Sequence, residues 1–246
     1  MNANQSEFHS AAVAPFECLK AGWAIIKDRY WLFLGATLLA LLIGGVVPIV
    51  LIGPMMCGLY LCLLGKMRGE QVQFEMLFKG FDYFVPALIA AVIQLVPIMI
   101  ILLPAEAVFM IFTFAVMPHD HAARNAGLPP IFFVVLAIFI FLAVIVSIAI
   151  HILFLFAYPL IVDRGLSGWD AIKTSARASL KNFGGLLGLV LLNTGLSILG
   201  LIACYVGIFF VMPITFAAYA AAYRQVFPDL PGRFASPPPP PPGWAA

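Results

Sequence analysis

The chain has 246 residues, of which 63% are hydrophobic and only 10% are charged. Soluble domains carry about 25% charged residues, so this composition excludes an ordinary soluble enzyme or binding module. A formal net charge of +2 gives no support to nucleic-acid binding, which needs a strongly basic surface. We therefore predict an integral membrane protein whose principal partner is the lipid bilayer.

Several apolar runs are long enough to cross a membrane. A bilayer core is spanned by about 20 apolar residues in a helix, which satisfies its own backbone hydrogen bonds. Short alternating runs, which are typical of membrane β-strands, do not occur in the sequence. The sequence therefore predicts an all-α fold with six transmembrane helices. The expected spans are Trp31–Ile52, Pro54–Leu64, Val85–Val116, Ile131–Val162, Phe183–Cys204 and Tyr205–Tyr223.

The turn between the first two spans has two candidate positions, because residues 31–64 contain no charge. It falls either near Gly44–Pro48 or near Gly53–Pro54, since glycine and proline mark turns. We favour Gly44–Pro48, because this position leaves both spans short but adequate.

The third and fourth spans each exceed a bilayer by about ten residues. Either they protrude together, or Pro104 begins a separate interfacial or re-entrant helix that extends to Met117, since proline suits a first helical turn. We assign Glu106 to the outer interface, two residues into the segment that begins at Pro104. A carboxylate there is favoured by the dipole of a helix amino terminus.

Basic residues are distributed very unevenly about these spans. Lys and Arg concentrate on the cytoplasmic side of membrane helices, so the distribution predicts that both termini are cytoplasmic. The first thirteen residues carry no Lys or Arg, and we expect no cleaved signal peptide. Of the Lys and Arg residues, we expect only Arg124 on the outer side of the membrane. The residues expected inside are Lys20, Lys27, Arg29, Lys66, Arg68, Lys79, Arg164, Lys173, Arg177, Lys181, Arg224 and Arg233.

A short phrase recurs before each outward span: FECLKAGW at 16–23, FEMLFKGF at 74–81 and WDAIKTSA at 169–176. Apolar residues at helical spacing predict an amphipathic helix in the membrane interface. An acid in the first turn suits the helix dipole, and a lysine three or four residues later pairs with it. The acids are Glu17, Glu75 and Asp170, and the lysines are Lys20, Lys79 and Lys173. Ser167 and Asp170 have capping-box spacing.

The apolar face expected of each interfacial helix contains large side chains. We expect this face to lie against the membrane, with the charged residues opposite it. In chain order, the three faces are Phe16, Leu19, Trp23, Ile26 and Tyr30; Phe74, Leu77, Phe78, Phe81 and Phe84; and Trp169, Ile172, Ala176 and Leu180.

The recurrence predicts three parallel two-span units at 11–70, 71–166 and 167–227. The returning spans of the first and third units share PMMCGLY at 54–60 and PITFAAY at 213–219. Chance similarity between apolar segments is the competing explanation.

We expect residues 1–10 to form an amino-terminal cytoplasmic tail. We expect the proline-rich residues 228–246 to form a disordered cytoplasmic tail. The alternative for the second tail is an extended ligand for an aromatic-lined groove of a partner protein.

Polar side chains within spans are costly, so each is a candidate site residue. At about 1.5 Å per residue, Gln94, His151 and Asn193 all lie near the bilayer midplane. They form either a polar layer for a small ligand or a proton, or separate structural hydrogen bonds between helices. Two pairs of small residues indicate close helix packing: Gly184 with Gly188, and Ala217 with Ala221.

The sequence contains no catalytic motif that we recognise. His119, Asp120 and His121 are adjacent in the outer loop, but three neighbouring residues without a fourth ligand are weak evidence for a metal. Four cysteines lack CxxC spacing and fit small hydrophobic packing residues. We expect no catalytic residues, no metal and no cofactor.

Two long stretches resemble a broad group of uncharacterised bacterial polytopic membrane proteins. They are LIGPMMCGLYLCLLGKMRGEQVQFEMLFKGF at 51–81, and YPLIVDRGLSGWDAIKTSARASLKNFGGLL at 158–187 leading to GIFFVMPITFAAYAAAYR at 207–224. The group includes the membrane domain attached to some glycerophosphoryl diester phosphodiesterases. The resemblance implies a helical fold in the bacterial inner membrane, and implies no catalytic residues.

We expect a non-enzymatic inner-membrane protein that acts in envelope or lipid organisation or as a partner of other membrane proteins. The three interfacial helices and the missing catalytic set motivate this hypothesis. The alternative is a small-molecule or proton-coupled transporter with a midplane polar site at Gln94, His151 and Asn193. The two hypotheses differ in whether these side chains share one cavity.

Overall fold

The computed structural model describes residues 8–10, 13–116, 129–203 and 206–228, and its regular structure is entirely helical in these ranges. Six helical segments are long and apolar enough to cross a membrane. The predicted class, an all-α membrane protein with six such helices, is confirmed. In chain order the elements are α1 (Pro15–Ile26), η2 (Lys27–Arg29), α2 (Tyr30–Val46), α3 (Pro48–Met67), α4 (Glu75–Phe78), η3 (Lys79–Tyr83), α5 (Phe84–Val116), α7 (Pro130–Phe154), α8 (Ala157–Arg164), α9 (Gly168–Lys181), α10 (Phe183–Ala203) and α11 (Gly207–Val226).

The turn between the first two spans falls at Val47, as favoured from the sequence. Helix α2 ends at Val46, and α3 begins with Pro48 in its first turn. Proline suits this position because its missing N–H group has no partner within the helix in any case. Pro54 lies inside α3, so the alternative turn at Gly53–Pro54 is wrong.

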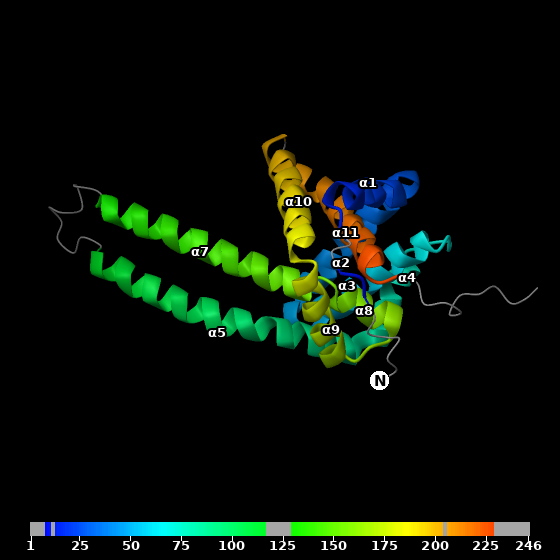
Figure 1. The fold of residues 1–246 in the computed structure, drawn as a ribbon, viewed down its shortest axis with the longest axis horizontal. Coiled ribbons are helices and arrows are strands. Elements are labelled where there is room, and N and C mark those ends of the chain that lie inside the picture. Colours follow the sequence, from blue (N-terminus) through cyan, green and yellow to red (C-terminus); the bar gives the residue numbers. More distant parts are fainter. Residues whose placement is uncertain (1–7, 11–12, 117–128, 204–205, 229–246) are drawn as a thin grey trace, which may run out of the picture.

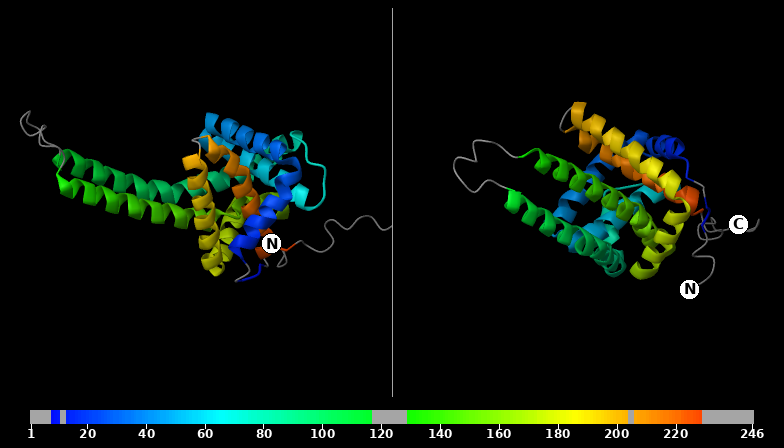
Figure 2. Two further views of the ribbon diagram at one scale, coloured as in Figure 1. Left: turned by 90° about the horizontal axis from the view of Figure 1, so that it is seen from above. Right: turned by 60° about the vertical axis from the view of Figure 1, so that its left-hand side comes forward.

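Helices α5 and α7 run side by side: at one end they pack against α9, and from there they project beyond the other helices as a long hairpin (Figure 1). Two further views show the same projection (Figure 2). Helix α5 continues through Pro97 and Pro104 to Val116, so of the two alternatives the long helices protrude together and a separate helix from Pro104 does not form. Glu106 therefore lies inside a helix, and the amino-terminal capping role predicted for it is wrong. A helix can keep an internal proline when only the bonds of one turn are lost.

The remaining helices form a body in which α1 packs across α11. Helix α1 buries Cys18, Gly22 and Ile26, and a Cβ atom added at Gly22 would lie 2.6 Å from the backbone nitrogen of Ala218. Phe16 is 68% exposed, so the apolar face predicted for α1 is only partly the face that packs. Small residues are preferred at such contacts because they let two helix backbones approach closely.

The second copy of the recurring phrase does not form one regular amphipathic helix. It begins at Glu75 as the four-residue α4 and continues as the 3₁₀ helix η3. Gly80 faces the backbone of Pro54 and Gly58 on α3, and a Cβ atom at Gly80 would overlap both. Close packing on α3 therefore replaces the regular helix that the pattern predicts. The predicted continuous apolar face does not form, and one of its residues, Leu77, is buried.

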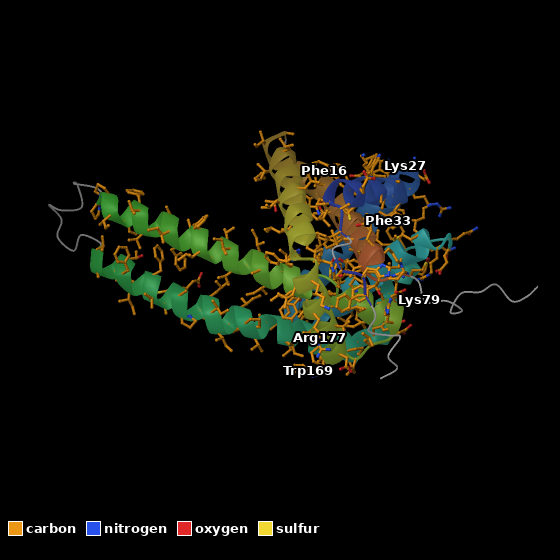
Figure 3. All side chains as sticks on the ribbon, in the orientation of Figure 1. Phe16, Lys27, Phe33, Lys79, Trp169 and Arg177 are labelled. Atoms are coloured by element: carbon orange, nitrogen blue, oxygen red, sulfur yellow. The ribbon has the colours of Figure 1, made fainter. Side chains whose placement is uncertain are left out.

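Helix α9 packs against α5, α7 and α8 through small residues. Ser175 is fully buried and joins α9 to the break between α7 and α8: it accepts a hydrogen bond from the Phe156 N–H (3.1 Å) and donates one to the Leu153 carbonyl (2.8 Å). Trp169, which is labelled in Figure 3, is 55% exposed, and Leu180 is 64% exposed. Ile172, on the same predicted face, is buried, so this face is divided between contact with other helices and exposure on the outside.

Candidate functional site

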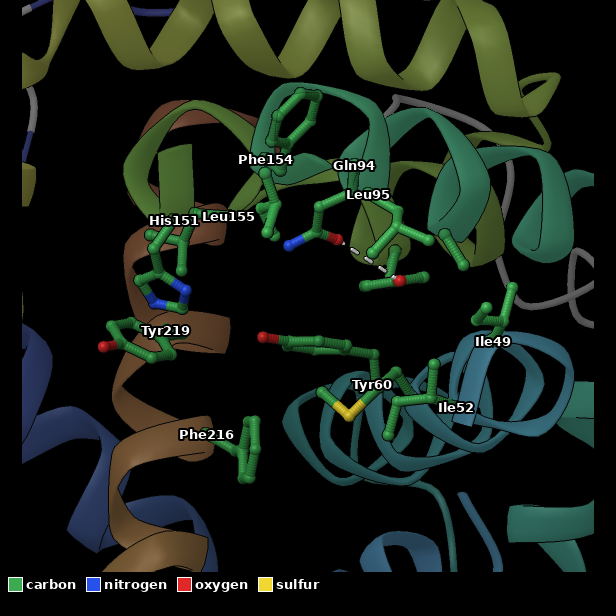
Figure 4. A pocket seen from close by; sticks show the side chains of 14 residues that line it. Ile49, Ile52, Tyr60, Gln94, Leu95, His151, Phe154, Leu155, Phe216 and Tyr219 are labelled. Carbon is green, nitrogen blue, oxygen red and sulfur yellow. Dashed lines mark hydrogen bonds between the residues drawn. The ribbon is translucent and has the colours of Figure 1, made fainter. Parts of the chain in front are cut away.

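A partly enclosed cavity of about 360 Å³ lies between α3, α5, α7, α8 and α11 (Figure 4). Most of its walls are aliphatic or aromatic, with a few polar groups among them. The lining residues from α3 and α5 are Ile49, Ile52, Met56, Tyr60, Ala91, Gln94, Leu95 and Ile98. Those from the other helices are His151, Phe154, Leu155, Tyr158, Phe216 and Tyr219.

Two of the three polar residues singled out from the sequence line this cavity. Gln94 enters from α5 and His151 from α7. The Gln94 carbonyl oxygen accepts a hydrogen bond from the Tyr158 hydroxyl at 3.4 Å, and the amide nitrogen points toward the open space (Figure 4). The His151 ring lies 5.5 Å from the Tyr219 ring, measured between ring centroids. His151 is exposed although helices surround it, because its ring borders the cavity.

Asn193, the third residue, does not line the cavity. It is buried in α10, and neither polar atom of its amide makes a hydrogen bond of ordinary geometry to a described residue. The amide nevertheless lies close enough to Tyr219 to interact with its hydroxyl, and that hydroxyl points away from the cavity (Figure 4). Tyr219 therefore stands between Asn193 and the cavity, so the predicted layer is divided into two parts.

Three tyrosines at the cavity were missed in the sequence. They are Tyr60 from α3, Tyr158 from α8 and Tyr219 from α11. The signal was present, because Tyr60 and Tyr219 end the shared phrases PMMCGLY and PITFAAY, and Tyr158 opens YPLIVDRG. Each returning span thus brings one tyrosine to the same cavity. Tyr60 is 2% exposed, and its hydroxyl points into the open space (Figure 4).

The three acids that open the recurring phrases lie away from the cavity. Glu17 pairs with Lys20 at 3.2 Å, and Asp170 with Lys173 at 3.3 Å. No ion pair joins Glu75 to Lys79 in the described part of the chain, so the pairing predicted for this copy is absent. Each acid lies in the first turn of its helix, as predicted.

The capping box predicted at α9 is confirmed. The Ser167 hydroxyl oxygen accepts a hydrogen bond from the Asp170 N–H at 3.2 Å, and the hydroxyl donates to the Asp170 carboxylate at 2.8 Å. The hydrogen bond from the Ser167 hydroxyl and, to a smaller degree, the contacts of Lys173 hold the pKa of Asp170 below its ordinary value. The arrangement explains why an acid occupies position 170 at the start of α9, and no role in ligand binding is needed to account for Asp170.

A second cluster of polar residues joins the ends of the returning spans. The Asp163 carboxylate accepts hydrogen bonds from Arg224 at 2.8 and 3.0 Å and from the Tyr223 hydroxyl at 2.8 Å. Arg68 approaches the same carboxylate at 3.6 Å. Arg164 is 2% exposed and lies over the Phe227 ring. The basic residue at the end of each returning span therefore contributes to one interface between α3, α8 and α11.

The described residues contain no group of three His, Cys, Asp or Glu side chains placed to hold a metal ion. His119, Asp120 and His121, and also Arg124 and Arg233, lie outside the residues that the structure describes. Three cysteines are free and buried, at Cys18, Cys57 and Cys62, while Cys204 falls in an undescribed position. Their burial fits the packing role expected for them.

Comparisons with protein-family models, with curated proteins and with solved structures find no match to this chain. The resemblance to bacterial polytopic membrane proteins therefore stays an expectation drawn from the sequence. The chemistry of the site has to follow from its own residues.

Proposed function

We propose that this chain is a non-enzymatic protein of the bacterial inner membrane that binds a small amphipathic molecule in the cavity between α3, α5, α7, α8 and α11. One observation carries the proposal: the apolar walls of a cavity inside the membrane-spanning bundle converge on the Tyr60 hydroxyl, the Gln94 amide and the His151 ring. Ligand sites of proteins combine apolar walls with a few placed polar groups in this way.

The cavity supports lipid organisation as the setting for this binding. Ile49, at its edge, is 48% exposed, so an apolar tail can continue from the cavity toward lipid. Among the polar groups, Gln94 is held at the wall by the hydrogen bond that it accepts from Tyr158. No described lining residue supplies a carboxylate or thiol for acid–base or nucleophilic chemistry, so binding requires fewer assumptions than catalysis.

The architecture that we propose around the cavity has three parallel two-span units with both termini in the cytoplasm. The tyrosine and the terminal arginine that each returning span contributes support the repeat. Lys27, Lys79 and Arg177 all lie on the body and not on the hairpin (Figure 3), which supports a cytoplasmic body through the positive-inside rule. In this arrangement the outward faces of α1 and α9, with Trp23 and Trp169, contact the membrane interface, and the proline-rich tail is available to a cytoplasmic partner.

Cavity filling tests the proposed function. We expect full-length protein purified in mild detergent to retain an apolar small molecule, detected by extraction and mass spectrometry. Met56→Trp fills the cavity, and we expect it to reduce the retained molecule at least fivefold. Val108→Trp adds the same side chain on the exposed surface of α5 and is expected to have no effect. A folded Met56→Trp protein that retains the same molecule in the same amount contradicts the proposal.

A transporter is the second candidate, favoured by His151. Among the described residues that line the cavity it is the one imidazole, the kind of group that proteins use to take up and release protons. In a variant without native cysteines, Met56→Cys distinguishes the two functions. Transport predicts that a membrane-impermeant thiol reagent reaches the introduced thiol from both sides of sealed vesicles in turn, whereas lipid binding predicts labelling only by a membrane-soluble reagent.

A further inference from the structure

We infer that the cavity recognises a neutral, planar ring that carries carbonyl oxygens and an apolar tail, which is the chemistry of a membrane quinone. The inference rests on the proposed function, because it names the class of molecule that occupies the same cavity. Three properties of the lining side chains support it: their hydrogen-bonding groups, their lack of charge and their aromatic rings.

The polarity of the site favours a hydrogen-bond acceptor on the ligand. The Gln94 carbonyl oxygen already accepts from Tyr158, so the part of the amide that faces the open space is its NH₂ group (Figure 4). An amide NH₂ group only donates hydrogen bonds. A carbonyl oxygen in the cavity satisfies this donor.

The Tyr60 hydroxyl supplies a second donor at the same space. Only 2% of Tyr60 is exposed, yet no described residue forms a hydrogen bond with its hydroxyl, which points into the cavity (Figure 4). The described residues around this hydroxyl offer it no hydrogen bond, and a hydroxyl in apolar surroundings gains free energy when a ligand oxygen pairs with it. A ligand oxygen between Tyr60 and Gln94 pairs both groups.

The charge of the site favours a neutral ligand. The described residues that line the cavity include no Lys, Arg, Asp or Glu. A carboxylate or phosphate placed there would be removed from water without a permanent opposite charge, which is unfavourable. A carbonyl group avoids this cost, so a quinone fits better than a fatty acid or a phosphorylated headgroup.

The aromatic side chains that line the site favour a flat ring. Five phenyl or phenol rings line the cavity together with the His151 imidazole. Aromatic side chains make their best contacts with another ring that is stacked or placed edge to face. The aromatic lining residues are Tyr60, Phe154, Tyr158, Phe216 and Tyr219.

A direct test uses three probes that each carry a long alkyl chain and differ in their head group. Full-length protein in phospholipid nanodiscs is titrated calorimetrically with decyl benzoquinone, with decylbenzene and with decanoate. We expect decyl benzoquinone to bind at least tenfold more tightly than either other probe, because decylbenzene lacks the carbonyl groups and decanoate carries a charge. Equal or tighter binding of decanoate overturns the inference in favour of a carboxylate ligand.

Two conservative variants test the assigned donors. Tyr60→Phe and Gln94→Leu each remove one donor, and we expect each to weaken decyl benzoquinone binding by roughly 5- to 20-fold, the usual effect of one hydrogen bond to a ligand. Tyr30→Phe is the matched control, because it removes a tyrosine hydroxyl that bonds to the Phe210 carbonyl outside the cavity, and a change below about twofold is expected. Decylbenzene affinity should be unchanged in all three, which shows that the cavity is intact.

The possible results separate this inference from the proposed function. If decylbenzene binds as tightly as the quinone and Tyr60→Phe changes neither affinity, carbonyl recognition is wrong, while apolar binding in the cavity stands. If no probe binds and Met56→Trp still retains the co-purified molecule, both proposals are wrong.

Discussion

The α5–α7 hairpin and the body are both strongly apolar, but they bury their side chains to very different degrees. In the most apolar windows of the third and fourth spans, 11% and 0% of residues are buried in the protein, against 61% in α3 and 50% in α11. The hairpin is also the more hydrophobic of the two, with a mean hydropathy of 3.4 in the fourth span against 1.3 in α11. Hydrophobicity and burial are thus inversely related here.

The difference shows what holds helices together in a membrane. Lipid tails are as apolar as leucine, so exposure of the hairpin costs nothing and a hydrophobic pattern provides no attraction between helices. The body instead uses small residues for close backbone contact, as at Gly22 and Gly80, and a buried ion pair at Asp163. Removal of these features should therefore destabilise the body, while similar changes in the hairpin should have little effect.

The largest effect is expected for Asp163→Asn. The Asp163 side chain is 6% exposed and pairs with Arg224, which is 11% exposed. Removal of one partner of a buried pair leaves an uncompensated charge and costs about 3–5 kcal/mol. We expect the free energy of unfolding, measured by denaturant titration in micelles, to fall by this amount. In Glu17→Gln, which breaks an exposed pair with Lys20, a decrease below about 0.5 kcal/mol is expected, and equal effects would contradict the distinction.

The next effect is expected for Gly80→Ala. The added methyl group would overlap the backbone of Pro54 and Gly58, and such overpacking typically costs about 1–3 kcal/mol. Gly195→Ala is the control, because nothing lies within 4 Å of the new atom and alanine favours a helix by up to about 1 kcal/mol. Thermal unfolding should therefore shift in opposite directions in the two variants. A shift in the same direction would show that backbone contact at Gly80 is unimportant.

A smaller effect is expected in the hairpin for Phe109→Ala. The Phe109 ring stacks on Phe139 with ring centroids 4.6 Å apart, and such a pair contributes about 0.5–1.5 kcal/mol. Val108→Ala, on a side chain that is 67% exposed, should leave unfolding unchanged because lipid contacts replace the lost ones. Hydrogen exchange along α5 measures both variants locally. Global destabilisation by Phe109→Ala above that of Gly80→Ala would reverse the proposed order.

The smallest effect concerns the capping box of α9. The pKa of Asp170 is lowered first by the Ser167 hydroxyl and then by Lys173. The resulting stabilisation is complete above the ordinary pKa of an aspartate and is lost as pH falls through the lowered value. Ser167→Ala should therefore raise the pKa of Asp170, as measured by ¹³C NMR of labelled aspartate, and Lys173→Met should raise it less. An unchanged pKa in Ser167→Ala would contradict the assigned cause.

The two pairs of small residues show how far such patterns predict contacts. Ala217 and Ala221 are both buried, and α1 crosses α11 at Ala217. Gly188 touches Pro15, but nothing lies within 4 Å of a Cβ atom placed on Gly184, so the predicted close packing is wrong at that position. A small residue permits close contact, but the partner helix decides whether contact occurs.

From the sequence alone, the approximate positions of the six apolar spans along the chain could be predicted. The lengths of the apolar runs, Pro48 at the start of α3 and the Ser167–Asp170 cap all act within one or two turns, so their effects can be read locally. The sequence also indicated Gln94 and His151, because polar residues inside apolar runs are conspicuous. Three features could be seen only in the tertiary structure: which helix faces are buried, the position of Asn193 behind Tyr219, and the meeting of three tyrosines from separate spans at one cavity. These depend on how closely distant backbones approach, which no local pattern specifies.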